Sequence, residues 1–118
     1  MPGKVTRGTV VMVNLDPTVG HEMKKTRRCV VIQNDIGNRY SPTTIVAPIW
    51  GAEHFKGAKP YPVMVFVQAG DGGTTKDSYV LCNQIRSVDE RRLGTIEGKL
   101  NSRTMKEVDT ALRISLAL

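Results

Sequence analysis

The chain has 118 residues, of which 40% are apolar, so it can bury one compact core but is too short for two ordinary domains. Seventeen Lys and Arg residues against eleven Asp and Glu residues give a net charge of +6, which favours polyanionic partners such as nucleic acids. Because no apolar run of about twenty residues and no signal-peptide pattern is present, we expect one cytoplasmic domain over residues 1–118 that does not enter a membrane.

Strand signals dominate the first half of the sequence. The β-branched run 9–13 (TVVMV) ends at 14–17 (NLDP), where a proline and turn-forming residues stop a central strand. The polar, glycine-containing segment 18–26 is predicted to be a loop, and strand character returns over 28–33. A second loop is expected over 34–43, because this stretch collects Asn, Asp, Gly, Ser and Pro.

Short apolar runs continue beyond this loop without helical periodicity. The irregular segment 50–62 and the turn-rich segment 69–73 separate them. Short strands at such close intervals, with no helix between them, favour an antiparallel barrel over a sheet of βαβ units. The predicted strands are 44–49, 63–68, 77–82 and 84–88.

The C-terminal segment changes its hydrophobic period. Met105, Val108, Leu112 and Leu116 recur at helical spacing, which predicts a helix packed on the barrel. Asn101 or Ser102 can cap its free N–H groups. The fold class is therefore mainly β with a C-terminal helix.

Strong signatures of nucleotide-driven or metal chemistry are missing from the sequence, so we expect no cofactor and no bound metal. Cys29 and Cys82 lie far apart in apolar runs, which is typical of reduced core thiols, and burial should raise the pKa of Cys29. His21 and His54 lie in different loops, where lone histidines are more often solvated than catalytic.

The loop 20–27 (GHEMKKTR) is the main candidate for chemistry. Glu22 precedes Arg27 by five residues, with Lys24 and Lys25 between them. Such a segment is either a solvated charged loop or a phosphate-binding loop, and an arginine fork suits the second role because it can bind two phosphate oxygens.

Ordered motifs along nearly the whole chain resemble the MazF/PemK family of toxin endoribonucleases. The resemblance implies a small SH3-like barrel, usually a homodimer, that cuts single-stranded RNA at short sequences without a metal and is neutralised by a cognate antitoxin. The residues that carry it are Arg7-Gly8, 13–22 (VNLDPTVGHE), Arg27, 30–35 (VVIQND), 36–43 (IGNRYSPT), 84–89 (QIRSVD), Arg92-Leu93 and 111–116 (ALRISL).

In the cleavage that the resemblance implies, the ribose 2′-oxygen attacks the neighbouring phosphorus, so positive charge is needed beside a dianionic transition state. Arg27 corresponds to the family's catalytic arginine, and we expect it to stabilise charge, because a guanidinium is a poor proton acceptor. Glu22 is a candidate base, or it pairs with Arg27 or Lys25 to order the loop. The predicted RNA contacts are Lys24, Lys25, Arg28, Asn34, Asp35, Arg39, Ser41, Trp50, Gln84 and Arg86. For Asn34 and Asp35 a turn role is favoured.

The sequence departs from the family pattern in two places. Lys24-Lys25 replaces a Gly-rich stretch and Arg28 replaces a proline, and both changes add charge near the phosphate. More seriously, Trp50 falls where the family keeps a threonine or serine hydroxyl. An indole cannot reproduce a hydroxyl, but it can stack on a base, which is typically worth about 1–3 kcal/mol, or it can anchor the end of the barrel.

The sequence is compatible with three functions. The leading one is an active ribonuclease toxin. The main alternative, suggested by Trp50, is a catalytically weakened module that binds RNA or sequesters an antitoxin. A gyrase-poisoning toxin of the same fold ranks lower, because Arg27 and the 33–35 segment (QND) resemble the nuclease branch.

Overall fold

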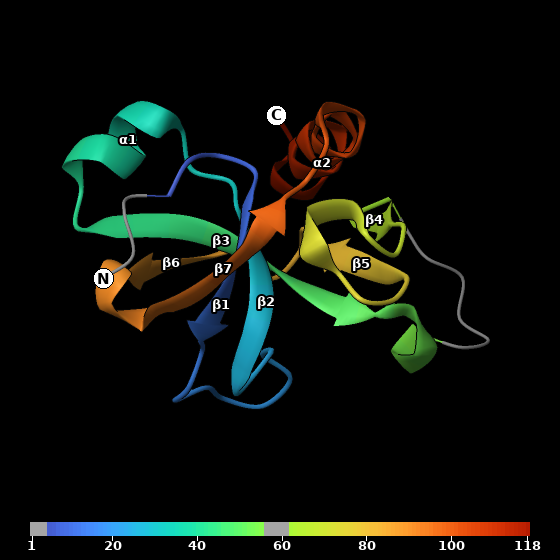
Figure 1. Ribbon diagram of the computed structural model, residues 1–118, viewed down its shortest axis with the longest axis horizontal. Helices are drawn as coiled ribbons and strands as arrows, with labels where there is room; N and C mark the ends of the chain where they lie inside the picture. Colours follow the sequence, from blue (N-terminus) through green and yellow to red (C-terminus); the bar gives the residue numbers. More distant parts are fainter. Residues whose placement is uncertain (1–4, 56–61) are drawn as a thin grey trace.

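The computed structural model describes residues 5–55 and 62–118 (Figure 1). Within these residues, strands form one seven-stranded antiparallel sheet, and two α-helices and three short 3₁₀ helices connect or cover them. The strands are β1 (Thr9–Asn14), β2 (Thr26–Val31), β3 (Thr43–Gly51), β4 (Met64–Val67), β5 (Ser78–Leu81), β6 (Arg86–Asp89) and β7 (Leu93–Lys99). The helices are α1 (Asp35–Tyr40), α2 (Ser102–Leu116), η1 (Ala52–Phe55), η2 (Asp71–Gly73) and η3 (Glu90–Arg92).

The long strand β3 links two parts of the sheet. Its first half pairs with β6 over 43–46, and its last residues pair with β5 over 49–51. The strand order is β4-β5-β3-β2-β1-β7, with β6 joined to β3 beside this path. The predicted mainly β fold with a C-terminal helix is confirmed. The described strands curve around the core without closing into a barrel, since the path ends at β4 and β7.

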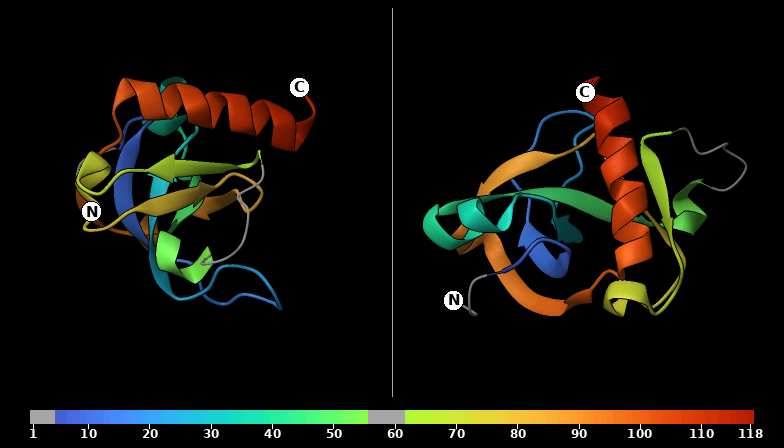
Figure 2. Two further views of the ribbon diagram at one scale, coloured as in Figure 1. Left: turned by 90° about the vertical axis from the view of Figure 1, so that its right-hand side faces the viewer. Right: turned by 90° about the horizontal axis from the view of Figure 1, so that it is seen from above.

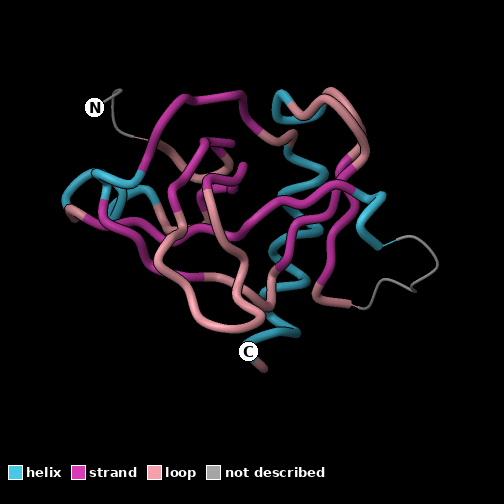
Figure 3. The backbone as a smooth tube through the Cα atoms, turned by 90° about the horizontal axis from the view of Figure 1, so that it is seen from below, coloured by secondary structure: helices cyan, strands magenta, loops and turns pink. Residues whose placement is uncertain are grey.

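Both faces of the sheet are buried at β1. Successive side chains of this strand point to opposite faces, so its valines lie in a core on one face or the other, which explains the continuous apolar run in the sequence. Val10 belongs to a cluster that α2 covers with Val108 and Ala111. Val11 and Val13 point into a second cluster, which the curled strands enclose themselves. Figure 2 shows α2 lying across one side of the strands, and Figure 3 shows the strands in magenta with the loops and helices that connect them.

The start of α2 is fixed by a polar cluster. Asn101 is the cap, and its side-chain oxygen accepts a hydrogen bond from the Thr104 N–H at 2.8 Å. Asp71 of η2 accepts hydrogen bonds from the Asn101 N–H at 2.8 Å and the Thr104 hydroxyl at 2.7 Å. The helix begins where the sequence predicted, with Asn101 rather than Ser102 as its cap.

The prediction of a loop over 34–43 was wrong, because this segment contains helix α1. Asn34 caps this helix by accepting the Gly37 N–H at 2.8 Å, a role its turn-forming character had suggested. Asn38 is buried, and its amide holds the helix on β3 by donating to the Gln33 carbonyl at 2.9 Å and accepting the Thr44 hydroxyl at 2.6 Å. A buried amide with several partners is stable in this position.

Strand β7 was also missed, and several strand ends differ from those predicted. Strand β2 begins at Thr26, two residues before the predicted start, and β3 extends through Trp50 to Gly51. The predicted irregular segment 50–62 is therefore partly strand and partly η1, and its residues 56–61 lie outside the described residues. Within the described ranges, no helix combines the length and apolar character needed to span a bilayer.

Candidate active site

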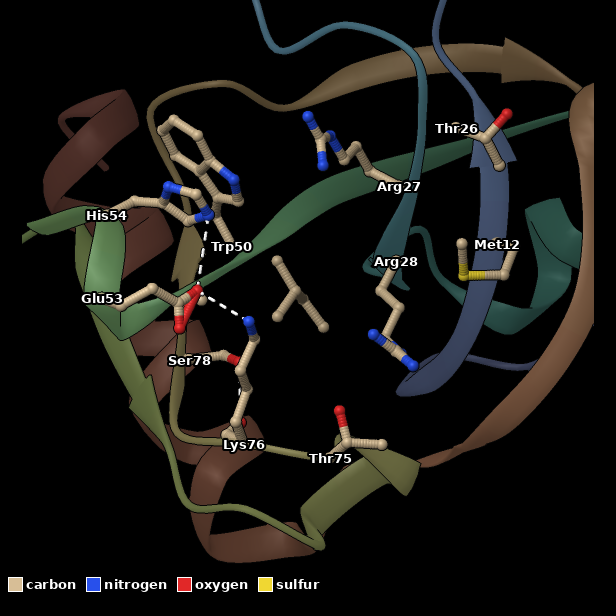
Figure 4. Close-up of a pocket in the computed structure, with 12 residues that line it drawn as sticks. Met12, Thr26, Arg27, Arg28, Trp50, Glu53, His54, Thr75, Lys76 and Ser78 are labelled. Atoms are coloured by element: carbon tan, nitrogen blue, oxygen red, sulfur yellow. Dashed lines mark hydrogen bonds and ion pairs between the residues drawn. The ribbon is translucent and has the colours of Figure 1, made fainter.

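Arg27 lies at the start of β2, where the β1–β2 loop rejoins the sheet. It pairs with Val13 of β1, and its half-buried side chain donates from Nε to the Lys24 carbonyl at 3.1 Å. This bond uses the inner nitrogen of the guanidinium. Figure 4 shows the outer nitrogens on the side of the pocket that Trp50 occupies. The geometry suits an arginine that presents its fork to an anion.

The loop that precedes Arg27 is held by backbone-directed hydrogen bonds. Asp16 accepts the Lys25 N–H at 3.0 Å, and the Lys25 carbonyl accepts the Leu15 N–H at 3.0 Å. Gln84 accepts the Met23 N–H at 2.7 Å. These bonds fix the loop against the sheet and leave the ammonium groups of its two exposed lysines available to solvent or a ligand.

Glu22 orders this loop in a way that the sequence did not predict. Its carboxylate accepts the Val19 N–H at 2.6 Å, whereas the described contacts include no ion pair with Arg27 or Lys25. The expected ion-paired role is therefore replaced by a backbone contact. The residue still lines the same pocket as Arg27, so its candidacy as a base stays a prediction.

Trp50 lies near the end of β3, opposite Tyr79 of β5. Its indole stacks on the imidazole of His54, with ring centroids 4.1 Å apart and planes inclined by 16°, and meets Phe55 edge-on at 5.5 Å. The indole Nε1 is buried and has no hydrogen-bond partner among the described residues. Trp50 is thus both an anchor for η1 and part of the wall of the pocket.

Arg27 and Trp50 line two adjoining hollows. One also contains the β1–β2 loop residues, and the other also contains Glu53, His54 and Lys76. His54 Nε2 lies 3.4 Å from Glu53 Oε1, and the same oxygen lies 3.0 Å from Lys76 Nζ (Figure 4). The hydrogen bond from Lys76 holds the pKa of the Glu53 carboxyl below its ordinary value, so this group is ionised at neutral pH. The hollow therefore combines a cationic wall with an imidazole that faces a carboxylate.

The structure brings together six of the twelve predicted site residues. One pocket of about 430 Å³ is lined by Glu22, Lys24, Lys25, Arg27, Trp50 and Gln84. Arg28 lines the adjoining hollow and lies 3.5 Å from Glu97 of β7 through its Nε. This grouping places both catalytic candidates and four of the ten predicted RNA contacts around one cavity.

The remaining predicted residues do not line this cavity. Arg86 lines a neighbouring hollow that shares Glu22 and Gln84 with it, and donates from Nη1 to the Leu15 carbonyl at 2.9 Å. Four others belong to α1 or its ends, at the opposite end of β3 from Trp50, a span of up to roughly 23 Å for seven residues at about 3.3 Å each. These four are Asn34, Asp35, Arg39 and Ser41.

Asp35 is engaged within the fold. Its carboxylate accepts the Arg7 N–H at 2.7 Å and the Asn38 amide at 3.2 Å, and these bonds lower the pKa of the carboxyl. Arg39 lines a separate apolar hollow beside Ile36 and Tyr40. One RNA molecule can therefore touch both this end of the chain and the Arg27 pocket only if it extends along the length of β3.

The cysteines are buried, as predicted. Burial raises the pKa of Cys29 to about 12, although the charge of Arg86 opposes the shift, and burial raises the pKa of Cys82 to about 11. Neither thiol is a nucleophile at neutral pH. Among the described residues, no group of three or more His, Cys, Asp or Glu side chains is placed to hold a metal ion.

Sequence reasoning missed the group formed by Glu53, His54 and Lys76. The three residues lie on two segments that only the pairing of β3 with β5 brings together, so no local motif marked them. The adjacent Glu53-His54 pair next to Trp50 was the one available signal. His54, expected in a loop and exposed to solvent, is exposed but lies in η1 and stacks on Trp50.

Comparisons with known proteins agree with this architecture. The chain matches the family described as PemK-like, MazF-like toxin of type II toxin-antitoxin system over residues 6–116. It is 46% identical over 114 residues to the Endoribonuclease EndoA of Bacillus subtilis (strain 168), which covers 97% of this chain and 96% of that protein. The chain therefore belongs to the PemK-like, MazF-like toxin family, as the sequence motifs predicted.

Solved structures show the same fold. The crystal structure of MazF (Form-I) from Deinococcus radiodurans superposes with a TM-score of 0.80 at 25% identity and covers 97% of each chain. An endoribonuclease from Mycobacterial species, solved in complex with its cognate antitoxin, gives a TM-score of 0.77 at 21% identity over 97% of this chain and 96% of that one. The curved sheet with its C-terminal helix is thus the fold of these toxins.

Proposed function

We propose that this chain cuts single-stranded RNA at short specific sequences without a metal ion, through attack of the ribose 2′-oxygen on the adjacent phosphorus. The broader class follows from family membership and from 46% identity to an endoribonuclease over nearly the whole chain: the protein is an endoribonuclease toxin of a toxin–antitoxin system. The proposal assigns the pocket between the β1–β2 loop and the end of β3 as the active site.

The observation that carries this proposal is the position of Arg27. A half-buried guanidinium with its inner nitrogen fixed on Lys24 presents its outer nitrogens to a pocket that also contains Lys25. Positive charge held in place before the substrate binds stabilises a dianionic transition state without reorganisation. The side chains of this protein can thus supply the positive charge that a bound metal ion supplies in metal-dependent nucleases.

Specificity is proposed to come from groups around this pocket. Single-stranded RNA exposes base edges that amides can read and base faces on which aromatic rings stack. Gln84 and Trp50 border the pocket from different strand ends and are suited to these two roles. Lys24, Lys25 and Arg28 are proposed to hold the phosphates on either side of the cleaved bond.

We also propose that residues 1–118 act as one domain in a cytoplasmic homodimer that a cognate antitoxin neutralises. The match to a toxin family of type II toxin–antitoxin systems over 6–116 supports both the single domain and the antitoxin. The homodimer is supported by two exposed apolar side chains on α1, Ile36 at 76% and Tyr40 at 74% exposure. Pairing two chains would also extend the basic surface available to RNA.

A catalytically weak RNA-binding module is the second candidate, because Trp50 offers no hydroxyl group in the pocket. One experiment separates the two. Long single-stranded RNA is incubated with the protein, with and without a chelator, and the fragment ends are mapped. The proposal predicts identical fragments in both conditions, each ending in a 2′,3′-cyclic phosphate and beginning with a 5′-hydroxyl. Binding without cleavage would support the weak module, and cleavage lost with chelator would contradict metal independence.

A further inference from the structure

Two imidazoles line the Arg27 pocket region, that of His21 in the main pocket and that of His54 in the adjoining hollow, and an imidazole is the type of side chain suited to proton exchange near neutral pH. The adjoining hollow shares Arg27 and Trp50 with the main pocket and is lined by His54 as well. Its hydroxyl groups, on Thr26, Thr75 and Ser78, do not ionise in this range. A guanidinium cannot accept a proton, so Arg27 does not fill the role either.

The orientation of His54 is fixed by two contacts. The ring lies flat on Trp50 at 4.1 Å, and its Nε2 faces Glu53 Oε1 at 3.4 Å. A carboxylate beside one ring nitrogen favours the tautomer that carries the hydrogen there. The lone pair of the neutral ring is then on Nδ1. This is the arrangement in which a carboxylate orients an imidazole as a general base.

The carboxylate that orients the ring is itself held. Lys76 Nζ lies 3.0 Å from the same Glu53 oxygen, and this contact keeps the pKa of Glu53 low. Figure 4 shows the chain of contacts from Lys76 through Glu53 to His54, with Arg27 on the far side of the indole. The other charged groups that line the hollow around the ring are Glu53, Lys76, Arg27 and Arg28.

We infer that His54 is the general base of the cleavage, with Nδ1 accepting the proton of the 2′-hydroxyl group as the 2′-oxygen attacks phosphorus. This inference rests on the proposed function and deepens it. Glu53 is a positioning residue, because it contacts the ring and not the RNA. Trp50 supplies the surface on which the ring is held.

The step balances without another reactant. The bond between the 2′-oxygen and phosphorus forms while the bond between phosphorus and the 5′-oxygen breaks. One proton leaves the 2′-hydroxyl for His54, and one proton from water completes the departing 5′-hydroxyl. The imidazolium then returns its proton to solvent, so the products are a 2′,3′-cyclic phosphate and a 5′-hydroxyl end, and no proton is consumed overall.

The test is the pH dependence of single-turnover kcat/KM on an RNA with one mapped cleavage site. For the unchanged protein, the rate should rise with pH as the ring loses its proton, then level off, because the neutral ring is the active form. His54→Phe keeps a flat ring on Trp50 but removes both nitrogens. It should lower kcat/KM by about a hundredfold or more on the plateau and abolish this rise, so that the two proteins converge at low pH.

Four further variants make the result specific. Glu53→Gln removes a negative charge beside the ring, so the rise should move to lower pH while a plateau remains. His54→Gln provides a second replacement if His54→Phe fails to fold, as judged by its thermal unfolding. Glu22→Gln and His21→Ala should each leave the rise in place, whatever their effect on rate.

The outcomes separate this inference from the proposed function. If the unchanged protein does not cut RNA, both are overturned. If it cuts RNA and the pH-dependent rise persists in His54→Phe or His54→Gln, only the role of His54 is overturned. The same holds if the rise disappears in Glu22→Gln or His21→Ala. A final test uses an RNA with sulfur in place of the 5′-oxygen at the cleaved bond. Sulfur leaves without being protonated, so it removes the need for a general acid but not for a general base. This substrate should not restore cleavage by His54→Phe, and restored cleavage would contradict the base role.

Discussion

Trp50 shows how one residue joins packing to chemistry in this protein. The sequence marked it as the point where a family hydroxyl is missing, and two roles were open: a base-stacking surface or an anchor. The structure shows the anchor, because the indole stacks on His54 and meets Phe55 edge-on. The stacked pair also forms part of the wall of the Arg27 pocket, so base stacking stays a prediction.

We expect Trp50→Thr to slow cleavage even though it restores a hydroxyl group. The change removes the surface that holds His54, and losing a large aromatic side chain from a packed site costs up to about 3 kcal/mol of folding stability. Trp50→Phe, the matched control, keeps a ring under His54 and should retain most of the activity. Cleavage rates and thermal unfolding of both variants check this. Faster cleavage by Trp50→Thr would show that the hydroxyl matters more than the stack.

At the residue scale, sequence reasoning worked where chemistry is local and failed where the fold brings distant segments together. Arg27 and the loop lysines, singled out by the loop sequence and the family resemblance, line one pocket, and Cys29 was correctly expected to be a buried thiol of raised pKa. His54 was missed, because its partners Trp50, Glu53 and Lys76 become a group only when β5 pairs with β3.

The β1–β2 loop is the element that sets the position of Arg27. Lys25 has a φ of 69°, in the left-handed region that favours glycine. This explains why the family pattern is Gly-rich at this stretch and why the lysine substitution adds charge at some conformational cost. The loop is held by hydrogen bonds that its Met23 and Lys25 N–H groups donate to the side chains of Gln84 and Asp16, rather than by its own backbone preference.

We predict that the loop lysines contribute to RNA affinity through charge. Lys24→Gln combined with Lys25→Asn removes both charges, and asparagine tolerates the left-handed conformation. If each lysine contacts a phosphate, the slope of log affinity against log salt should flatten by about 1.4, from about 0.7 per contact with a single strand. Binding measured across a salt series checks this. An unchanged slope would place both side chains away from the RNA.

Helix α2 depends on its cap. Asn101→Ala removes the acceptor for the Thr104 N–H and one partner of Asp71, so we expect a loss of about 1 kcal/mol in the free energy of unfolding. Ser102→Ala, one residue further along, is the control and should change stability by much less. Denaturant unfolding of the two variants gives the comparison. Equal effects would show that the cap is shared between the two residues.

Local pattern found most of the elements but not α1 or β7. Segment 34–43 has turn-forming composition, and what makes it a helix is the Asn34 cap together with the buried amide of Asn38, which bonds to Gln33 and Thr44 on either side of the segment. Strand β7 (LGTIEGK) carries two glycines and few strand-forming residues. Gly98 is required there, because a Cβ atom would lie 2.7 Å from the backbone of Gly72.

For the whole molecule, the separation between the two groups of predicted RNA contacts limits how one chain can bind RNA. One group surrounds Arg27, and the other belongs to α1, at the other end of β3. Ile36 and Tyr40 leave exposed apolar surface on α1, whereas the charge of the chain is +6. A dimer that buries α1 would cover this apolar surface and combine the positive charges of two chains in one particle.

We therefore expect light scattering at micromolar concentration to give a mass close to twice 13.0 kDa. Tyr40→Glu places a charge in the apolar surface of α1 and should shift the protein toward the monomer. Leu118→Glu, at another highly exposed apolar position, serves as the control and should not. A monomeric mass for the unchanged protein at this concentration would contradict the proposed homodimer.

The role of Arg27 is the central claim, and single-turnover cleavage of RNA by Arg27→Ala, measured together with RNA affinity, tests it most directly. Loss of one preorganised charge-stabilising group should lower the cleavage rate at least about a hundredfold, while affinity falls far less. Arg113→Ala removes the same charge from the exposed end of α2 and should leave the rate unchanged. If Arg27→Ala cuts RNA as fast as the unchanged protein, or loses rate only in proportion to affinity, then Arg27 is a binding residue and the assigned active site is wrong.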